Sequence, residues 1–338
     1  MSDIDVFIVG GGPAGLAAAI AARREGMRVV VADGDQPPID KPCGEGLMPD
    51  SRRLATRLGI EIPESMGYEF RGIRFHAAGR SVEGNFSAGC GVGVRRTDLH
   101  RALVQAAERA GVELRWSTPL SAFDKLKARW IVGADGSSSL VRRWAGLDPV
   151  ASGSRRYAYR RHFAVAPWTN YMEIYWGEGC QIYVTPVGAR EVCVALVSRS
   201  PELRLEEALG RYFPALRERL PAGSEASRER GAVTGNVRLR AVARGNIALV
   251  GDASGSVDAI AGEGICLGFR QAEILAKALV QGDLSGYNRR HPWLSLRPHL
   301  MAKTMLQLDR GQMVRSLAMG VLSEHQWIFR TLLKAHTT

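Results

Sequence analysis

Closely spaced glycines near the start of the chain have the types and spacing needed to hold a pyrophosphate. Gly10, Gly12 and Gly15 follow a short apolar stretch and form the pattern G-x-G-x-x-G. In such a pattern the first glycine allows a tight turn, the second lets backbone amides approach the phosphates, and the third lets helix and strand pack closely. A structural turn alone could also use these glycines, so their neighbours decide between the two interpretations.

The flanking residues favour dinucleotide binding. Residues 4–9 predict a buried strand, and residues 16–24 predict a helix, with Pro13 and Ala14 in the glycine-rich turn that leads into it. That turn presents free N–H groups and the positive end of the helix dipole to an anion. Asp33 ends a second apolar stretch and is placed to accept hydrogen bonds from a ribose diol.

Two later strand ends carry further polar residues. Residues 129–134 predict a strand that ends at Asp135, and Arg142 follows on the start of a helix. Residues 247–250 predict another strand, which ends at Gly251 and Asp252. Each of these acids could instead cap a helix or form a surface ion pair.

Gly262, Gly264 and Ile265 lead from the third strand end into a helix expected to run to about residue 280. The amino end of that helix would stabilise negative charge on a bound group.

Residues 41–49 (K-P-C-G-E-G-L-M-P) form a loop too rich in glycine and proline for regular structure. Cys43 and Glu45 are the two side chains in it that could give a proton to a reacting carbon. The alternative is that glycine and proline shape the loop while Cys43 merely packs.

Composition excludes several classes of protein. The chain has 338 residues, of which 46% are hydrophobic, so we expect about two domains and a sizeable core. No apolar run reaches the roughly 18 residues of a spanning helix, and the first predicted strand leaves no room for a secretory signal. The five scattered cysteines lack C-x-x-C spacing and predict reduced thiols in the cytoplasm, with no metal site. We expect a monomer.

The net charge of +11 is not accompanied by a nucleic-acid-binding motif or a lysine-rich block, so we expect no nucleic-acid partner. The tail after residue 286 mixes apolar residues with basic ones. Its charged residues are Arg289, Arg290, Arg297, Lys303, Arg310, Arg315, Arg330 and Lys334, against Asp309 and Glu324. Two interpretations stay open: helices packed on the body with a solvated basic face, or peripheral contact with anionic lipid headgroups.

The order of the predicted elements gives a fold class, α/β, with a Rossmann-like nucleotide-binding domain, an inserted antiparallel-sheet domain and C-terminal helices. We assign residues 1–65, 91–150 and 240–285 to the first domain. Residues 66–90 and 151–239 form the inserted substrate domain, whose strands lie within 157–165, 172–176, 181–185 and 191–198. Residues 286–338 form the helical segment.

The three motifs, in this order and context, resemble the FAD-dependent oxidoreductases of the aromatic-hydroxylase fold. Within that group the K-P-C-G loop and the stretch from Gly251 to Ile265 are most similar to the geranylgeranyl reductase branch. The resemblance implies FAD as cofactor, with Asp252 on its ribityl chain and Asp135 and Arg142 near its pyrophosphate. It also implies that Arg96 reaches the phosphate or ribityl region. Tyr183 and Pro186 match, loosely, a strand that lines the reductases' substrate cavity.

The resemblance implies hydride transfer from reduced flavin to a carbon–carbon double bond of an apolar, prenyl- or polyketide-like substrate. No second G-x-G-x-x-G is present, so NAD(P)H would bind only transiently as electron donor. One alternative is a monooxygenase that hydroxylates an aromatic or polyketide substrate through a flavin C4a-hydroperoxide. Another is a flavin-binding or electron-carrying protein without small-molecule turnover.

Overall fold

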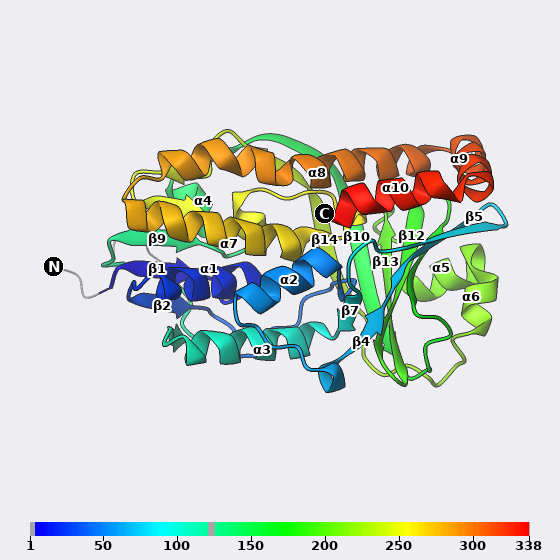
Figure 1. Ribbon diagram of the computed structural model, residues 1–338, viewed down its shortest axis with the longest axis horizontal. Coiled ribbons are helices and arrows are strands. Elements are labelled where there is room, and N and C mark those ends of the chain that lie inside the picture. The colour runs from blue at the N-terminus through cyan, green and yellow to red at the C-terminus, as the bar shows by residue number, and fades with distance from the viewer. Residues whose placement is uncertain (1–3, 121–125, 338) are drawn as a thin grey trace.

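A six-stranded, mostly parallel sheet forms the core of one half of the computed structural model, which describes residues 4–120 and 126–337 (Figure 1). All its neighbouring strands are parallel except the antiparallel pair β15–β16. In spatial order the strands are β15 (Ala243–Arg244), β16 (Ile247–Leu249), β9 (Trp130–Gly133), β1 (Val6–Val9), β2 (Val29–Ala32) and β8 (Glu113–Arg115). The central strands are short and buried along their whole length, as expected for a parallel sheet covered on both faces.

Helices cover both faces of this sheet. One face packs against α1 (Pro13–Arg24), α3 (Arg96–Arg109) and α7 (Gly264–Gln281), and α2 (Pro49–Arg57) lies beside α7. The other face packs against the short helix α4 (Leu140–Trp144). The strands predicted within residues 4–9, 129–134 and 247–250, and the helices that follow them, are therefore confirmed.

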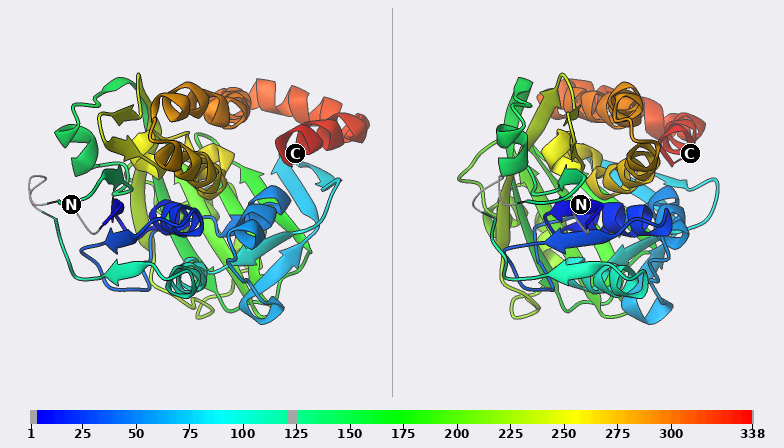
Figure 2. Two further views of the ribbon diagram at one scale, coloured as in Figure 1. Left: turned by 60° about the vertical axis from the view of Figure 1, so that its left-hand side comes forward. Right: turned by 90° about the vertical axis from the view of Figure 1, so that its left-hand side faces the viewer.

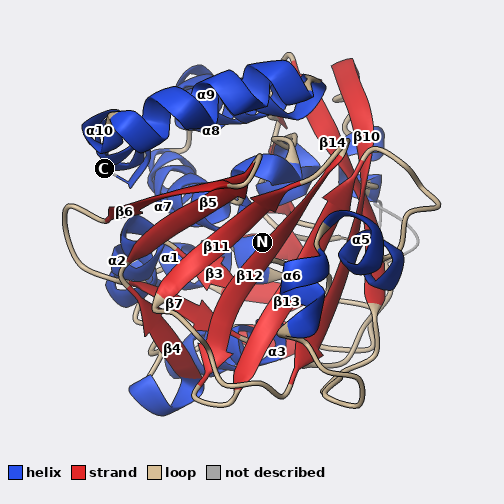
Figure 3. Cartoon of the chain, turned by 90° about the vertical axis from the view of Figure 1, so that its right-hand side faces the viewer, coloured by secondary structure: helices blue, strands red, loops and turns tan. Residues whose placement is uncertain are grey.

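The second half is a seven-stranded sheet, antiparallel except for the parallel pair β11–β5. Its spatial order is β14 (Arg230–Leu239), β10 (Pro149–Phe163), β13 (Glu191–Ser198), β12 (Cys180–Gly188), β11 (Tyr171–Trp176), β5 (Gly72–Ala77) and β6 (Arg80–Asn85). Figure 3 shows α5 (Leu205–Tyr212) and α6 (Pro214–Glu218) against its outer face. The alternating strands predicted between residues 157 and 198 are confirmed, although β10 begins earlier, at Pro149.

A small three-stranded sheet connects the two halves. Its spatial order is β3 (Gly46–Leu47), β7 (Gly91–Val94) and β4 (Gly67–Phe70). A short 3-10 helix at Glu64–Met66 comes directly before β4 in the chain. β3 directly follows the K-P-C-G loop, so this sheet fixes the loop between the helical half and the large sheet.

The C-terminal helices α8 (Ser285–Arg310), α9 (Gln312–Glu324) and α10 (Gln326–Thr337) form a layer across both halves, seen along the top of Figures 1 and 2. α8 packs on α7, and α10 packs on β6. At the end of α8, Asp309 is buried and bonds Arg156 of β10 at 3.0 Å. Arg156 also bonds Asp258 at 3.3 Å, so one buried cation links the large sheet, α8 and the segment that precedes α7.

Candidate functional site

The three sequence motifs meet at one edge of the parallel sheet, because β16, β9, β1 and β2 are neighbours whose carboxyl ends lie together. Gly10 has φ of +110°, and a Cβ there would lie 2.4 Å from the Ala134 carbonyl oxygen. A Cβ on Gly251 would lie 2.7 Å from the Cβ of Ala14. These close approaches show how the first motif packs against both of the others.

The amino end of α1 is open in the way a phosphate needs. Gly12 is the N-cap residue and Pro13 the first helical residue, with no side chain bonded to the cap. A Cβ added to Gly12 would find no atom within 4 Å. Gly15 is the opposite case, since its Cβ would lie 2.0 Å from the Gly10 carbonyl oxygen. The second glycine thus faces open space and the third is required for packing.

Asp33 is fixed by backbone amides at the end of β2. Its carboxylate accepts hydrogen bonds from Gly11 N at 2.6 Å and Asp35 N at 2.8 Å. His100 of α3, fully buried, donates from Nε2 to the Gly11 carbonyl at 2.8 Å, and burial lowers its pKa. Sequence reasoning missed His100, and its only sequence signal is its place on the apolar face of α3.

Asp135 and Arg142 bind protein groups of their own. Asp135 accepts hydrogen bonds from Ser139 Oγ at 2.5 Å and from Leu140 N at 2.6 Å, so it holds the start of α4. Arg142 donates to the carbonyls of Ser137 at 2.6 Å and Ala253 at 3.2 Å. Arg142 therefore ties the second strand end to the third.

Asp252 lies where the third strand ends, in the short 3-10 helix Gly251–Ser254. Its side chain is exposed at the mouth of the strand end, and the surrounding protein partly desolvates the carboxyl and so raises its pKa, an effect that the charge of Lys41 partly opposes. Lys41 also approaches the second motif, since a Cβ on Gly136 would lie 3.9 Å from its Nζ. The K-P-C-G loop thus begins beside both strand-end acids.

The start of α7 is also open. Gly262 has the left-handed φ of +67° that ends the 3-10 helix Ala259–Ala261, and α7 begins at Gly264, followed by Ile265. A Cβ on Gly262 or on Gly264 would meet no atom within 4 Å. From inside the helix, Gln271 accepts the Gly251 N–H at 2.7 Å and thereby links α7 to the third motif.

Arg96 begins α3 and is almost fully buried. Its Nη1 has no hydrogen-bond partner among the described residues, although a buried guanidinium is costly unless paired. Its backbone N–H donates to Glu45 Oε1 at 3.0 Å. Arg96 is therefore a buried cation with donor capacity left for an anionic ligand.

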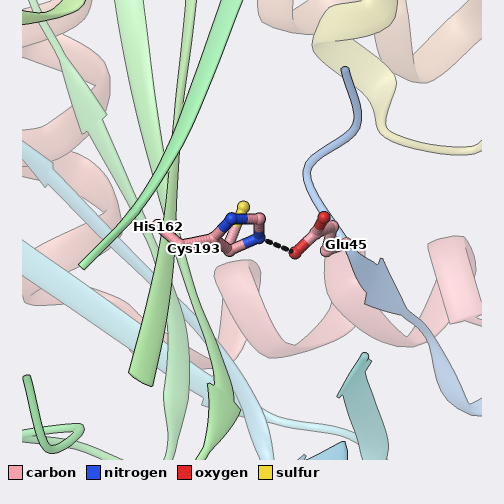
Figure 4. A group of neighbouring side chains, drawn as sticks. All are labelled: Glu45, His162 and Cys193. Atoms are coloured by element: carbon pink, nitrogen blue, oxygen red, sulfur yellow. Dashed lines mark hydrogen bonds and ion pairs between the residues drawn. The ribbon is translucent and has the colours of Figure 1, made fainter. Parts of the chain in front are cut away.

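Cys43 and Glu45 lie together at the far end of the loop. The Glu45 N–H donates to Cys43 Sγ at 3.3 Å, and burial, as the largest cause, raises the pKa of the Cys43 thiol. Glu45 has a positive φ of 59°, a strained conformation that glutamate adopts only when its surroundings impose it. Its side chain points to the large sheet, where it contacts His162 (Figure 4).

Tyr183 and Pro186, expected to line a substrate cavity, are both buried in β12. Tyr183 donates its hydroxyl to the Ile260 carbonyl at 2.9 Å. The Pro186 carbonyl lies against β7, so close to Gly93 that a Cβ there would be 1.8 Å away. Both residues join the sheet to neighbouring segments.

The donor set suits FAD. Open backbone at Gly12 and Gly264, an orphaned donor on buried Arg96 and a fixed carboxylate at Asp33 match what its pyrophosphate, its pyrimidine edge and its ribose require. Residues 3–125 match the family model described as FAD binding domain. The expected FAD-binding fold is thereby confirmed.

Two relatives of this chain are reductases by name. A menaquinone reductase of Mycobacterium tuberculosis is 28% identical over 83% of this chain and 78% of its own length. A digeranylgeranylglycerophospholipid reductase of Thermoplasma volcanium is 27% identical over 84% of this chain and 81% of its own.

Solved structures share the fold. A flavin-dependent brominase has a TM-score of 0.81 at 16% identity and covers 99% of this chain and 93% of its own. A geranylgeranyl bacteriochlorophyll reductase-like protein of Thermoplasma acidophilum has a TM-score of 0.74 at 20% identity, with coverages of 98% and 99%.

Proposed function

We propose that this chain, an FAD-dependent oxidoreductase, reduces a carbon–carbon double bond in the isoprenoid chain of a lipid. Bound FAD, reduced by a transiently bound NAD(P)H, would supply the hydride. The chain would hold the cofactor through Gly12, Asp33 and Arg96. Its relatives' names support the reductase class, since both denote reductases of lipids with isoprenoid chains.

The observation that carries the proposal is the Cys43 thiol. A hydride added to a double bond leaves a carbon that must take up a proton, and a thiol, whose ordinary pKa lies above neutral pH, still carries a proton to give. Burial raises the pKa of Cys43 further. Gly44 beside it faces open space, since its Cβ would meet no atom within 4 Å. Cys43 is the acid we assign.

A hollow next to the third motif supports an apolar substrate. It measures about 570 Å³ and lies between β14, the segment after Ser254, α7 and α8. Most of its exposed lining surface is apolar, from residues such as Val237, Leu267 and Leu296, although arginines and histidines also line it (Arg238, Arg240, His291 and His299). A volume of this size is typical of pockets for small molecules. Because Cys43 is not among its lining residues, we assign it to the part of the isoprenoid chain away from the reacting bond.

We also propose that α8, α9 and α10 lie on an anionic membrane, from which the substrate enters. They carry widely exposed apolar side chains, including Trp293 at 74%, Met313 at 76% and Trp327 at 66% exposure. The same helices expose the basic side chains of Arg289, Arg290, Arg297, Lys303, Arg330 and Lys334. Leu296 of α8 lines both the apolar hollow and a second one that Trp293 borders.

Charge favours a bilayer over a second copy of the chain as the occupant of this surface. Among the described side chains, Glu324 is the exposed acid on the three helices, because Asp309 is buried. Two such basic surfaces would repel each other, whereas each basic residue near an anionic bilayer contributes about 1 kcal/mol. None of the described helices combines the length and apolarity required to cross a bilayer.

Vesicle sedimentation tests this surface. We expect the chain to bind vesicles of phosphatidylglycerol and phosphatidylcholine, to bind phosphatidylcholine alone weakly, and to release in high salt. Replacing Trp293 and Trp327 together by serine should weaken binding at least tenfold. Val233→Ser, at a 55% exposed position on β14, is the matched control. Salt-independent binding to neutral vesicles, or a dimer that hides these tryptophans, would contradict the proposal.

The reaction itself is tested without oxygen. The FAD-loaded chain, NADPH and a polyprenyl lipid in mixed vesicles should give a product heavier by about 2 mass units per reduced bond. In deuterated water one of the added hydrogens should be deuterium, delivered by the acid. Oxygen uptake coupled to an oxygenated product would instead establish the monooxygenase alternative.

A further inference from the structure

A buried chain of hydrogen bonds connects the K-P-C-G loop to the protein surface. His162 of β10 is 2% exposed and donates from Nε2 to Glu45 Oε2 at 2.7 Å (Figure 4). Because a carboxylate only accepts, Nε2 carries a proton, and because Arg160 Nη1, 3.2 Å from Nδ1, can only donate, Nδ1 is an acceptor. Ser227 Oγ lies 2.9 Å from Nδ1 and accepts the His162 backbone N–H at 3.0 Å. The serine hydroxyl proton and Arg160 therefore share Nδ1 as an acceptor.

We propose that Ser227, His162 and Glu45 form a proton-transfer chain that reloads the Cys43 loop from solvent. This inference rests on the proposed reduction, which consumes one proton at Cys43 in each turnover. Ser227 is half-buried, and both its neighbours, Ala226 and Arg228, are exposed. The outer end of the chain thus reaches water. The inner end, Glu45, is two residues from Cys43: its backbone N–H donates to Cys43 Sγ at 3.3 Å, and its charge adds to the raised pKa of that thiol.

The transfer balances without any further reactant. After Cys43 gives its proton to the substrate carbon, it is a thiolate. Glu45 passes it a proton received from His162 Nε2, while His162 takes the Ser227 proton at Nδ1. Ser227 takes a proton from water, so the net change is one thiolate and one water converted to a thiol and a hydroxide.

The groups around the chain favour proton transfer over metal binding. The side-chain ligand atoms of Glu45, His162 and Cys193 lie within 4.8 Å of one another, a set that suits zinc by type. However, the Arg160 Nε lies 3.7 Å from Glu45, and its Nη1 lies 3.2 Å from His162 Nδ1. Two buried arginines, Arg96 and Arg160, would repel a divalent cation.

Asp40 neutralises part of the remaining positive charge nearby. Asp40 pairs with Arg160 and, at 2.8 Å, with Arg230 of β14. Burial, as the largest cause, raises the pKa of Cys193 well above its ordinary value, so that thiol stays neutral. The row Arg156, Arg160 and His162 results from the two-residue period of β10, which turns these side chains to the same face.

The kinetic test uses the FAD-loaded full chain. His162→Gln keeps a hydrogen-bonding side chain but cannot relay a proton, so turnover should fall at least tenfold while FAD reduction by NADPH is unchanged. Imidazole buffer should restore turnover in proportion to its concentration. His76→Gln is the matched control, because His76 bonds Glu173 of the same sheet at 3.1 Å, away from the loop. Turnover of His162→Gln at the wild-type rate, or a loss that imidazole never restores, would overturn the proposed proton-transfer chain.

If His162→Gln does not fold, Ser227→Ala tests the same proton-transfer chain at its outer end. This surface change should lower turnover several-fold and raise the solvent isotope effect. An unchanged isotope effect would overturn the outer step.

Alkylation of Cys43, followed by mass spectrometry on the FAD-free chain, tests the inner end independently of any reaction. The negative charge of Glu45 adds to the rise in the Cys43 pKa, so Glu45→Gln should speed alkylation at pH 8 several-fold. An unchanged rate would overturn the coupling. If Glu45→Gln speeds alkylation of Cys43 but the wild-type protein reduces no double bond, the result would count against the proposed function and not against the coupling of Glu45 to Cys43.

Discussion

Replacing Gly12 by valine is expected to abolish FAD binding and to leave the fold intact. Gly12 has φ of −71° and ψ of 179°, which valine adopts without strain, and its Cβ would meet no protein atom within 4 Å. The valine side chain would fill the space in which the pyrophosphate comes close to the backbone N–H groups. We expect the purified variant to lack flavin absorbance and to bind added FAD at least about 100-fold more weakly, a loss near 2.7 kcal/mol.

Two further glycines separate loss of cofactor from loss of fold. Gly15→Ala would place a Cβ 2.0 Å from a carbonyl oxygen, so it should lower the unfolding temperature of the FAD-free chain as well. Gly210→Val, in α5 and also free of contacts, should change neither property. Normal FAD affinity in the Gly12 variant would mean that the amino end of α1 does not hold the phosphates.

The parallel sheet and its loops could be predicted because their signals are local. Short apolar runs ending in Gly10, Asp135 and Gly251 indicate strands followed by sharp turns, and the chain order of the motifs resembles a known arrangement. The resemblance implied that the three motifs bind one cofactor, and the strand order β16-β9-β1-β2 brings their strand ends together.

The environment of Glu45 could not be predicted, because its partners are distant in sequence. His162 is 117 residues away, and Arg96 is 51 residues away. Alternating basic residues in β10 are equally typical of a solvated face. Tertiary contacts bury them, because Glu45 of the K-P-C-G loop lies against His162 and Asp309 of α8 lies against Arg156. The positive φ of Glu45 is likewise imposed by tertiary contacts, since local propensity would place glycine there.

The two strand-end acids, Asp135 and Asp252, differ in what their side chains contact. Asp135 uses its oxygens on the start of α4, whereas the Asp252 side chain stays open to solvent. Sequence spacing treats the two alike. The difference arises because Ser139, the N-cap of α4, lies four residues after Asp135, whereas Asp252 lies inside the short 3-10 helix Gly251–Ser254, well before α7 begins.

Replacing Cys43 by serine is expected to stop substrate reduction while FAD binding and its reduction by NADPH continue. Serine keeps an acceptor for the Glu45 N–H, so the loop should hold its shape. A hydroxyl gives up its proton far less readily than even a buried thiol. Loss of a positioned general acid typically costs 10²–10⁴-fold, and we expect a fall of about that size in kcat.

The pH dependence of wild-type turnover gives a second test of Cys43 as the acid. Burial raises the pKa of Cys43, so the thiol keeps its proton through neutral pH and loses it only in alkaline solution. Turnover should therefore be level near pH 7 and fall as the pH rises through the thiol pKa, whereas residual turnover of the serine variant should lack that fall. Cys90→Ser, at another partly accessible thiol, is the control and should retain full activity. If the Cys43 variant reduces substrate at the wild-type rate, the thiol only packs in the loop, and the proton must reach the substrate from another group.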